Sequence, residues 1–267
     1  MDLFNQSSFQ NKLPFILPQK EGYSYFFDED KKAFIITIPN GKLIFVPIFF
    51  DENLNNELMS YLLKNENNLN CKVTNWRNFE KENLSEIKFT NINWTHNQIK
   101  IFGKLLFEPR FSAWYGDSDA AYSYSGLKLK PNPWNEKLLF IKSKIESLIE
   151  KIEKTETIEK KESLKFNSVL LNWYRDGQDS MGWHSDNEKE LGQNPVIASL
   201  NFGATRRFLF RKIDKTKDKK EKLEFSLTNG SLLIMAGQIQ HFWQHSVPKE
   251  SKIKDNRINL TFRVVRN

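Results

Sequence analysis

The stretch Gly182-Trp183-His184-Ser185-Asp186 carries two metal-binding residue types two positions apart. Side chains at positions i and i+2 of an extended strand point to the same side, so the His184 imidazole and the Asp186 carboxylate can bind one metal ion together. Two histidines and one carboxylate are the ligand set expected for non-haem Fe(II), with the opposite face open for O₂ and a co-substrate. The alternative is a structural pair that binds no metal.

The third ligand must come from elsewhere in the chain, which has four histidines. Two of these, His241 and His245, follow in a later part of the sequence, and the fourth, His96, lies upstream. The residue types alone leave His241 and His245 both open as partners of His184 and Asp186.

A second polar group occurs at residues 257–263, where apolar residues alternate with Arg257, Asn259, Thr261 and Arg263. A strand with this alternation turns its apolar side toward a core and places both guanidiniums on the other side. A guanidinium binds a carboxylate bidentately, so two inward-facing arginines fit a small dicarboxylate. The alternative is a surface strand whose arginines are solvated.

The overall composition fits a globular protein, because 39% of the 267 residues are hydrophobic and 27% are charged. This length predicts one large domain, or one domain with an extension. The single cysteine, Cys71, excludes an internal disulfide and indicates a reducing compartment, which also suits Fe(II). Residues 1–10 lack a signal-peptide pattern, and no stretch has the ~20 apolar residues that a membrane span requires.

The net charge of +7 and the pI of about 9.2 indicate a polyanionic partner such as nucleic acid, although many basic proteins bind none. Residues 99–126 combine aromatic and basic side chains, among them Arg110, Trp114, Tyr115, Tyr122 and Tyr124. Aromatic rings stack on bases, and cations bind phosphates. A buried sheet edge with a basic rim explains the same composition.

Local patterns predict the elements that must position these residues. Aromatic and β-branched residues between positions 23 and 47, interrupted by Asn40-Gly41, predict a small β element with a hairpin. Asp51 is the predicted N-cap of an amphipathic helix that ends near residues 65–70. A second helix, with an apolar stripe along one face, is predicted to begin near Asn135.

After Leu164 the pattern is that of short strands separated by turn signals. Apolar and β-branched runs predict strands at residues 169–174, 196–203, 206–210, 223–227, 231–235 and 257–264. Asn229-Gly230 and the charged stretch at 214–221 mark two of the turns. Many short strands of this kind indicate an all-β sandwich or barrel.

Together, these motifs resemble the AlkB type of Fe(II)/2-oxoglutarate-dependent dioxygenase, most closely the members that act on alkylated duplex DNA. The resemblance covers residues 95–267 and rests on Asn172-Trp173-Tyr174, 182–186, 230–235, His245-Ser246-Val247-Pro248, 257–263, Phe102-Gly103-Lys104, Pro109-Arg110, Tyr115-Gly116-Asp117 and 122–127.

The resemblance implies an α+β, mainly β fold: a double-stranded β-helix (jelly roll) with flanking helices and an N-terminal extension. Residues 1–95 are then the extension, packed on the core. Residues 96–267 are the dioxygenase domain, with a nucleotide-recognition lid at 99–126.

The resemblance also implies roles for individual residues. It selects His245 over His241 as the third metal ligand, so that His184, Asp186 and His245 bind Fe(II). His241 is then a packing residue or a neighbour of the metal ligands, and His96 is structural. The co-substrate 2-oxoglutarate is implied to contact Asn172, Tyr174, Arg257, Thr261 and Arg263.

In the resembled enzymes the target base leaves the duplex before it reacts. Tyr124 and the His184 ring are then expected to sandwich the flipped base. Tyr122 and Glu188 are expected to contact its polar edge, and Phe102 to fill the vacated stack. Further substrate contacts are expected from Ser125 and, on phosphates, from Lys104, Arg110, Arg206 and Arg207.

The implied reaction is oxidative demethylation of N1-methyladenine and N3-methylcytosine in DNA repair, using Fe(II), 2-oxoglutarate and O₂ and releasing formaldehyde, succinate and CO₂. The alternatives are the same reaction on RNA, including tRNA, and a non-catalytic nucleic-acid-binding module. Two residues differ from the pattern of the resembled enzymes: Asn187 stands where an acidic residue is expected, and Tyr124 stands where the enzyme that acts on duplex DNA has Phe. These differences leave the preferred base open. We expect a monomer that binds alkylated DNA and no membrane, in a bacterial cytoplasm or a eukaryotic nucleus.

Overall fold

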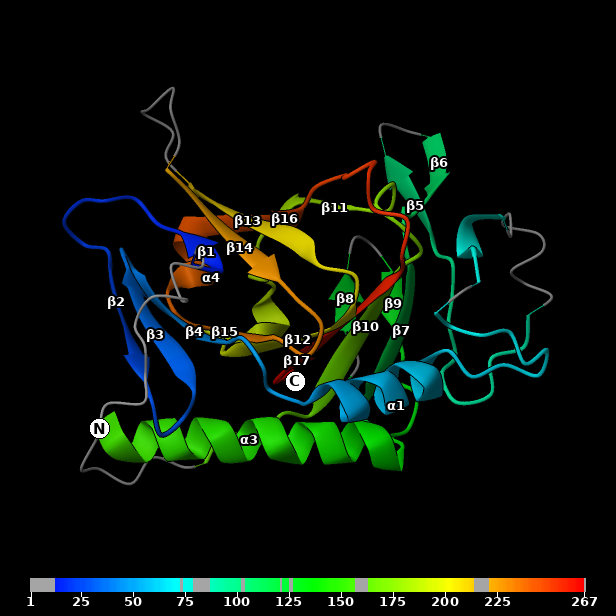
Figure 1. The fold of residues 1–267 in the computed structure, drawn as a ribbon, viewed down its shortest axis with the longest axis horizontal. Helices are drawn as coiled ribbons and strands as arrows, with labels where there is room; N and C mark the ends of the chain where they lie inside the picture. Colours follow the sequence, from blue (N-terminus) through cyan, green and yellow to red (C-terminus); the bar gives the residue numbers. More distant parts are fainter. Residues whose placement is uncertain are drawn as a thin grey trace, which may run out of the picture.

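Two antiparallel β-sheets face each other in the computed structural model (Figure 1). The structure describes residues 13–72, 74–78, 87–101, 104–120, 122–124, 127–156, 163–213 and 221–266. The smaller sheet has the order β1 (Phe15–Ile16), β14 (Lys222–Leu227), β13 (Arg206–Lys212), β16 (Trp243–Val247) and β11 (Met181–His184). The larger sheet has the order β2 (Ser24–Asp28), β3 (Ala33–Ile38), β4 (Gly41–Val46), β15 (Leu232–Gly237), β12 (Ile197–Gly203), β17 (Arg257–Arg263), β10 (Ser168–Tyr174) and β7 (Phe111–Gly116). The predicted mainly β fold with flanking helices is confirmed.

Two helices, α1 (Glu52–Leu62) and α3 (Glu136–Glu156), lie on the outer face of the larger sheet (Figure 1). Both begin where the sequence predicts, because the Asp51 carboxylate accepts a hydrogen bond from the Leu54 amide at 2.8 Å and the Asn135 side chain accepts one from the Leu138 amide at 3.0 Å.

The end of α1 differs from the prediction, which placed it near residues 65–70. The helix ends at Leu62, and the Asn65 amide group donates to the carbonyls of Leu63 and Leu69. Side-chain hydrogen bonds of this kind offer the backbone an alternative to the helix, which explains the earlier end.

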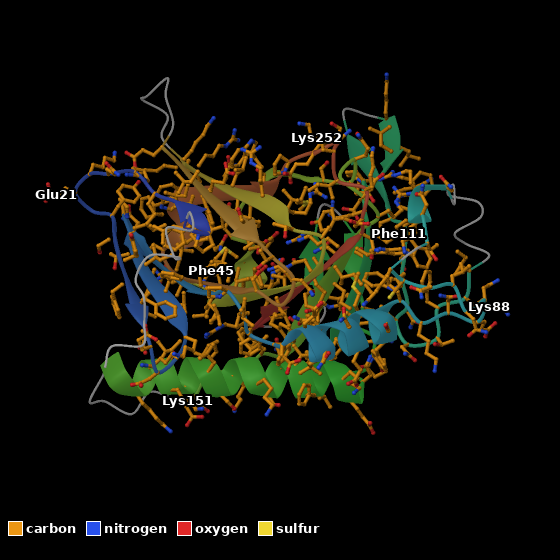
Figure 2. All side chains as sticks on the ribbon, viewed as in Figure 1. Glu21, Phe45, Lys88, Phe111, Lys151 and Lys252 are labelled. Carbon is orange, nitrogen blue, oxygen red and sulfur yellow. The ribbon has the colours of Figure 1, made fainter. Side chains whose placement is uncertain are left out.

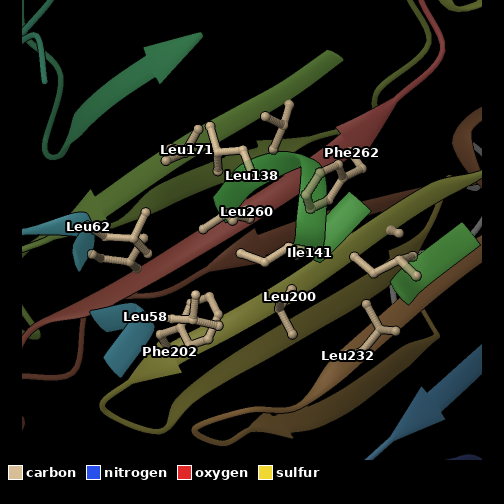
Figure 3. Close-up of a cluster of buried hydrophobic side chains, with 14 of the residues drawn as sticks. Leu58, Leu62, Leu138, Ile141, Leu171, Leu200, Phe202, Leu232, Leu260 and Phe262 are labelled. Atoms are coloured by element: carbon tan, nitrogen blue, oxygen red, sulfur yellow. The ribbon is translucent and has the colours of Figure 1, made fainter. Parts of the chain in front are cut away.

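The hydrophobic core has two layers, because successive strand residues point to opposite faces of the larger sheet. The outer layer packs against the helices and includes Leu58, Leu138, Ile141, Leu200 and Leu260 (Figure 3). The inner layer fills the space between the sheets and includes Phe45, Ile197, Phe210, Phe225 and Trp243. Figure 2 shows Phe45 in the interior, with the charged side chains of Glu21 and Lys88 at the periphery.

The strands near the N-terminus belong to the larger sheet, because β4 pairs with β15. Strands β3 and β4 form the predicted hairpin, with Ile38 opposite Gly41 and Asn40 at a φ of 65° in the turn. Strands β2, β3 and β4 therefore share a sheet with β10 and β17, which carry part of the site. The division at residue 95 remains a prediction.

The predicted lid at residues 99–126 overlaps two hairpins and contains one strand of the larger sheet. The hairpins are β5 (Gln98–Ile101) with β6 (Lys104–Phe107), and β8 (Tyr122–Tyr124) with β9 (Leu127–Leu129). Trp114 and Tyr115 are buried in β7, an edge strand of the larger sheet. For these two residues the alternative of a buried sheet edge therefore holds. Phe102 and Ser125 lie outside the described residues, as do the side chains of Tyr122 and Tyr124.

The remaining elements are short: a four-residue helix, α4 (Ile239–Phe242), and single-turn 3₁₀ helices at Trp76–Asn78 and Lys189–Leu191. The one cysteine, Cys71, is a buried free thiol. Across the described ranges, no helix is long and apolar enough to cross a membrane.

Candidate metal centre

His184 and His245 lie opposite each other on two neighbouring strands, β11 and β16. The centres of their rings are 4.2 Å apart. Asp186 follows two residues after His184 and is 1% exposed. Ligand atoms of these three residues lie within 4.8 Å of one another, and within the described ranges no other group of His, Cys, Asp or Glu residues could hold a metal ion.

Hydrogen bonds orient two of the three side chains. The His184 Nδ1 atom is 2.9 Å from the Gly182 carbonyl oxygen, and because a carbonyl only accepts, Nδ1 carries the proton and Nε2 is left with the lone pair that binds metals. The Asp186 Oδ2 atom accepts a hydrogen bond from Arg263 Nη2 at 2.9 Å. The Asp186 backbone amide donates to the Gln240 side chain at 2.9 Å.

Two buried polar atoms in this cluster have no hydrogen-bond partner: Asp186 Oδ1 and His245 Nδ1. A buried polar atom without a partner is destabilising by about 1–3 kcal/mol, so such atoms are rare in native proteins. Two imidazoles and one carboxylate are the donor set of non-haem iron sites. The unsatisfied carboxylate oxygen and this donor set both fit a divalent transition metal.

The surroundings keep these groups in the protonation states that bind metal. Burial opposes ionisation of Asp186, but the charges of Arg263, His245 and His184 outweigh it and lower the pKa of this carboxyl to about 2. Burial, assisted by the charge of His184, lowers the pKa of His245 to about 3. Burial also lowers the pKa of His184. At neutral pH the carboxylate is therefore ionised and both imidazoles are neutral.

The cluster lies at one side of a cavity between the two sheets. Four residues predicted to contact a co-substrate line it: Asn172, Tyr174, Thr261 and Arg263. The rest of the lining is mostly apolar and consists of Leu170, Met181, Ser199, Phe208, Met235, Val247 and Asn259. The structure therefore brings the three candidate metal ligands together with four of the five candidate co-substrate residues.

Arg257, the fifth, does not line this cavity but lies against Tyr174, which does. Its guanidinium is 5.1 Å from the centre of the Tyr174 ring and is 1% exposed. Its Nη2 atom donates to Asn201 Oδ1, while Nε and Nη1 have no hydrogen-bond partner. Burial lowers the pKa of Arg257 to about 10. Two unused donors on a buried cation fit a carboxylate ligand.

A row of polar side chains crosses the larger sheet beside the cavity. Asn259 on β17 lies between Asn172 on β10 and Asn201 on β12. The Thr261 hydroxyl donates to Asn259 Oδ1 at 2.9 Å, and Asn259 Nδ2 donates to the Ser199 hydroxyl at 2.8 Å. These bonds fix the direction of each side chain, so the polar wall of the cavity is organised before any ligand binds.

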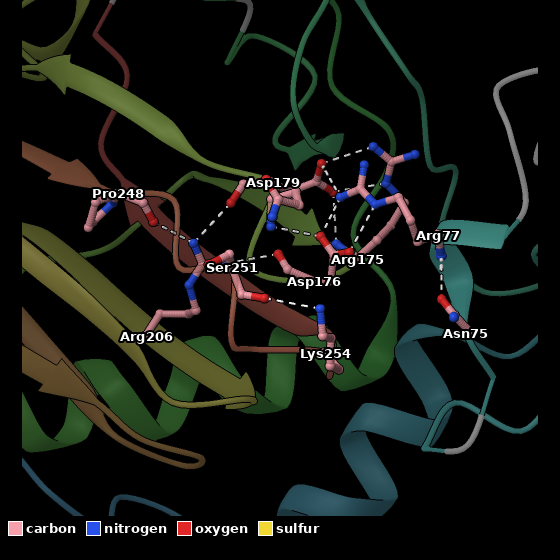
Figure 4. Close-up of polar contacts among 10 residues, drawn as sticks. Asn75, Arg77, Arg175, Asp176, Asp179, Arg206, Pro248, Ser251 and Lys254 are labelled. Carbon is pink, nitrogen blue, oxygen red and sulfur yellow. Dashed lines mark hydrogen bonds and ion pairs between the residues drawn. The ribbon is translucent and has the colours of Figure 1, made fainter.

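The segment that leads to His184 is held by a buried ion-pair cluster (Figure 4). Asp179 is 1% exposed and accepts hydrogen bonds from the backbone and guanidinium of Arg175 at 2.9 Å and from Arg77 at 2.8 Å. Asp176 accepts a further bond from Arg77 Nε at 3.1 Å. This cluster restrains the loop between β10 and β11, and with it the approach to the candidate metal ligand His184.

A family model of the 2OG-Fe(II) oxygenase superfamily matches residues 46–263 of the sequence. The chain belongs to this superfamily. The match covers most strands of both sheets, including those around the three clustered residues. The superfamily takes its name from the two cofactors that its members use, 2-oxoglutarate and Fe(II), which confirms the predicted cofactor pair.

Curated relatives of this 2OG-Fe(II) oxygenase include the alpha-ketoglutarate-dependent dioxygenase alkB homolog 3 of Bos taurus. It is 45% identical over 164 residues, which are 59% of this chain and 52% of the relative. The DNA oxidative demethylase ALKBH2 of Bos taurus is 39% identical over 172 residues, or 63% of this chain and 57% of the relative. The chain thus spans just over half the length of these relatives. The solved structure of OsALKBH1 aligns with this chain at a TM-score of 0.48 and 15% sequence identity. The alignment covers 83% of this chain and 96% of the OsALKBH1 chain.

Three polar residues of this oxygenase site were missed in the sequence analysis: Ser199, Asn201 and Gln240. The first two lie two positions apart in a strand that otherwise reads as apolar, and that spacing on one face was the available signal. Gln240 bonds the Asp186 amide from a four-residue helix, and no sequence pattern indicates this contact.

His241 is not the packing residue or neighbour of the metal ligands that the sequence analysis expected. It is exposed on α4, whereas the preceding residue, Gln240, is 1% exposed. Adjacent positions on a helical turn point in different directions, so only one of the two faces the cluster. His96 is structural, as predicted: its Nε2 atom is 2.8 Å from the Glu108 carbonyl oxygen, and its ring stacks on Phe111.

The predicted phosphate contacts of Arg110 and Arg206 need correction. Arg110 is 4% exposed and Arg206 is 1% exposed, and both guanidiniums donate to protein acceptors. A guanidinium buried in this way cannot reach a phosphate at the surface. Arg207 and Lys104 are exposed, so their contacts remain predictions, as does the contact of the half-buried Glu188 with a base.

The metal-free protein is expected to lose stability as the pH falls from about 6.5 toward 4. The unfolded chain has a histidine pKa near 6.5, whereas folding lowers the pKa of His245 to about 3. The unfolded state therefore binds more protons in this window, so acidification favours unfolding. Urea unfolding at a series of pH values tests this. In the His245→Gln variant the free energy of unfolding should depend less steeply on pH. An unchanged slope would contradict the lowered pKa of His245.

Proposed function

We propose that this chain is an Fe(II)- and 2-oxoglutarate-dependent dioxygenase that demethylates N1-methyladenine and N3-methylcytosine in DNA. The observation that carries the proposal is the cluster of His184, Asp186 and His245 beside two buried arginines, at a cavity between the sheets. The similarity to a relative that is named a DNA oxidative demethylase supports the choice of substrate.

In this proposal His184, Asp186 and His245 bind the iron. Iron held there would supply, with 2-oxoglutarate and O₂, the oxidation that converts the N-methyl group to formaldehyde and 2-oxoglutarate to succinate and CO₂. Arg263 holds the Asp186 carboxylate in its ionised form through the 2.9 Å bond to Oδ2. Phe208 stacks on the His245 ring with centres 5.2 Å apart and restricts its orientation.

The co-substrate is bound by the polar wall. Arg257 offers two unused donors to one carboxylate of 2-oxoglutarate, and Tyr174, whose ring lies against Arg257, closes that end. Asn172, Thr261 and Arg263 face the cavity and contact the rest of the co-substrate. The apolar lining from both sheets excludes water, which strengthens these charge contacts.

The two hairpins of the predicted lid receive the base. A base must leave the duplex to reach a buried site, which costs a few kcal/mol and less when methylation has already broken the pair. The β8–β9 hairpin carries Tyr122 and Tyr124, and the β5–β6 hairpin flanks Phe102. In the proposal Tyr124 and the His184 ring stack on the flipped base, Tyr122 and Glu188 contact its polar edge, and Phe102 fills the place that the base leaves. Ser125 makes a further contact with the substrate.

The test compares methylated DNA and RNA strands of the same sequence, with formaldehyde release as the readout. The proposal predicts faster release from the 1-methyladenine DNA strand than from the RNA strand, and none from unmethylated DNA. Faster formaldehyde release from the RNA strand would show that RNA, and not DNA, is the preferred substrate. Consumption of 2-oxoglutarate without formaldehyde from either strand would overturn a nucleic-acid substrate.

A further inference from the structure

We infer that Arg110 is a positioning residue that fixes which end of the Asn172 amide faces the co-substrate. The inference rests on the proposed function, since it concerns how the cavity binds 2-oxoglutarate. It assigns Arg110 a role in the wall of the cavity, in place of the phosphate contact expected from the sequence.

Three buried side chains form a chain of contacts that ends at the cavity. The Glu108 carboxylate accepts a hydrogen bond from Arg110 Nη2 at 2.5 Å, and Arg110 Nε donates to Asn172 Oδ1 at 2.9 Å. Glu108 is 3% exposed, Arg110 is 4% exposed and Asn172 is 8% exposed. Asn172 alone of the three lines the cavity.

The chemistry of the guanidinium decides the orientation of the amide. Arginine has only donors, so the atom of Asn172 that faces Arg110 must be the oxygen. The opposite orientation would place two donors against each other in a buried site, which is strongly unfavourable. The Nδ2 amino group, on the other branch of the amide, then faces away from Arg110. Asn172 therefore offers the cavity a donor, which is the group that a carboxylate requires.

Glu108 explains why Arg110 acts through Asn172 and not on the co-substrate itself. Its carboxylate neutralises the guanidinium within the wall, so the charge of Arg110 is already paired. Arg257 differs in this respect, because it forms no ion pair with any described residue and keeps two donors unused. One buried arginine thus orients an amide, and the other remains free for a carboxylate.

The same contacts connect the cavity wall to the base of the β5–β6 hairpin. Asn97 and Glu108 flank this hairpin, and the Glu108 amide donates to the Asn97 carbonyl at 2.9 Å. Asn97 Nδ2 donates to the Ser112 hydroxyl at 2.8 Å, and Ser112 lies opposite Asn172 across β7 and β10. The orientation of the Asn172 amide is therefore set by groups in the short connection between β6 and β7, which these hydrogen bonds join to Asn97 and β7.

The test measures 2-oxoglutarate binding to Mn²⁺-loaded protein by titration calorimetry, which involves no turnover. Arg110→Met alone would leave Glu108 buried without a partner, so we use the double variant Glu108→Gln/Arg110→Met. We expect its Kd for 2-oxoglutarate to rise about tenfold while Mn²⁺ affinity is retained, because one charge-assisted hydrogen bond is lost. The matched control is Glu224→Gln/Arg207→Met, which makes the same changes in a surface ion pair and leaves the Kd as in the wild type.

The Asn172→Asp variant provides a second test that does not depend on the stability of the double variant. Its carboxylate keeps the acceptor for Arg110 but turns an anionic oxygen toward the cavity. We expect a Kd raised more than tenfold and a melting temperature no lower than that of the wild type. Wild-type Kd values in both folded variants would overturn the inference alone. Failure of the wild-type protein to bind 2-oxoglutarate would overturn the proposed function as well.

Discussion

The His245→Ala variant is expected to lose metal binding and turnover, whereas the His241→Ala variant keeps both. His245 is 3% exposed and lies opposite His184 across two paired strands, at the same side of the cavity as Asp186. His241 is exposed on α4 and belongs to no cluster of potential ligands within the described residues. The two variants make the same chemical change, so their difference isolates the position of the imidazole.

The expected size of the effect follows from the role of a ligand. Mutation of a residue that only orients a metal ligand lowers metal affinity by about 10–100-fold. Removal of the ligand itself should therefore lower metal affinity by at least about 100-fold. Calorimetric titration with Mn²⁺, a divalent stand-in that resists oxidation, measures this directly. Loss of binding in His241→Ala with retention in His245→Ala would show that the third ligand has been assigned to the wrong histidine.

The Arg206→Met variant is expected to lower the free energy of unfolding by about 3–5 kcal/mol, the usual effect of breaking a buried charge network. Arg206 is 1% exposed and donates to the carbonyl oxygens of Asp176, Asp179 and Pro248 at 3.1, 2.9 and 2.6 Å (Figure 4). Its Nε atom also donates to the Glu250 carboxylate at 3.1 Å. Methionine fills the space but leaves these acceptors without donors.

The position of these acceptors makes Arg206 important for the metal centre as well. Asp176 and Asp179 lie in the segment that leads to His184, and Pro248 follows the strand that carries His245. Arg206 therefore joins the two segments that carry the histidine ligands. We expect the variant to bind Mn²⁺ more weakly even under conditions in which it remains folded.

Arg207→Met is the matched control for this prediction. Arg207 is the next residue, and its half-exposed side chain pairs with Glu224 at 2.8 Å on the surface. Surface ion pairs contribute about 0–1 kcal/mol, so the control should remain close to the wild type. Urea unfolding of the metal-free proteins measures both variants. Equal losses of stability would mean that the buried network contributes no more than a surface pair.

Features that depend on local sequence were predicted well. The N-cap Asp51, the helix start near Asn135, the hairpin at Asn40-Gly41 and the alternation along β17 follow from neighbouring residues, and each has the expected structure. The closeness of His184 and Asp186 was also predicted from their spacing, although β11 ends at His184 and Asp186 follows the strand. In each case residues close together in the sequence decide the local structure.

Features that depend on distant segments could not be derived from residue types. The choice of His245 over His241 depends on the pairing of β11 with β16, and the residues alone left it open. The acceptors of Arg206 are backbone carbonyls from two distant loops, for which no sequence pattern exists. Arg110 is an intermediate case, because the spacing of Glu108 and Arg110 would place both side chains on one face of an extended segment.

The most direct test of coupled demethylation is to measure succinate and formaldehyde in one reaction. The protein is reconstituted without oxygen with Fe(II), 2-oxoglutarate and a 1-methyladenine DNA strand, and O₂ is then added. We predict equal amounts of the two products, and neither product from the His245→Ala variant. Succinate without formaldehyde on both the DNA strand and its RNA counterpart would contradict base demethylation by this protein.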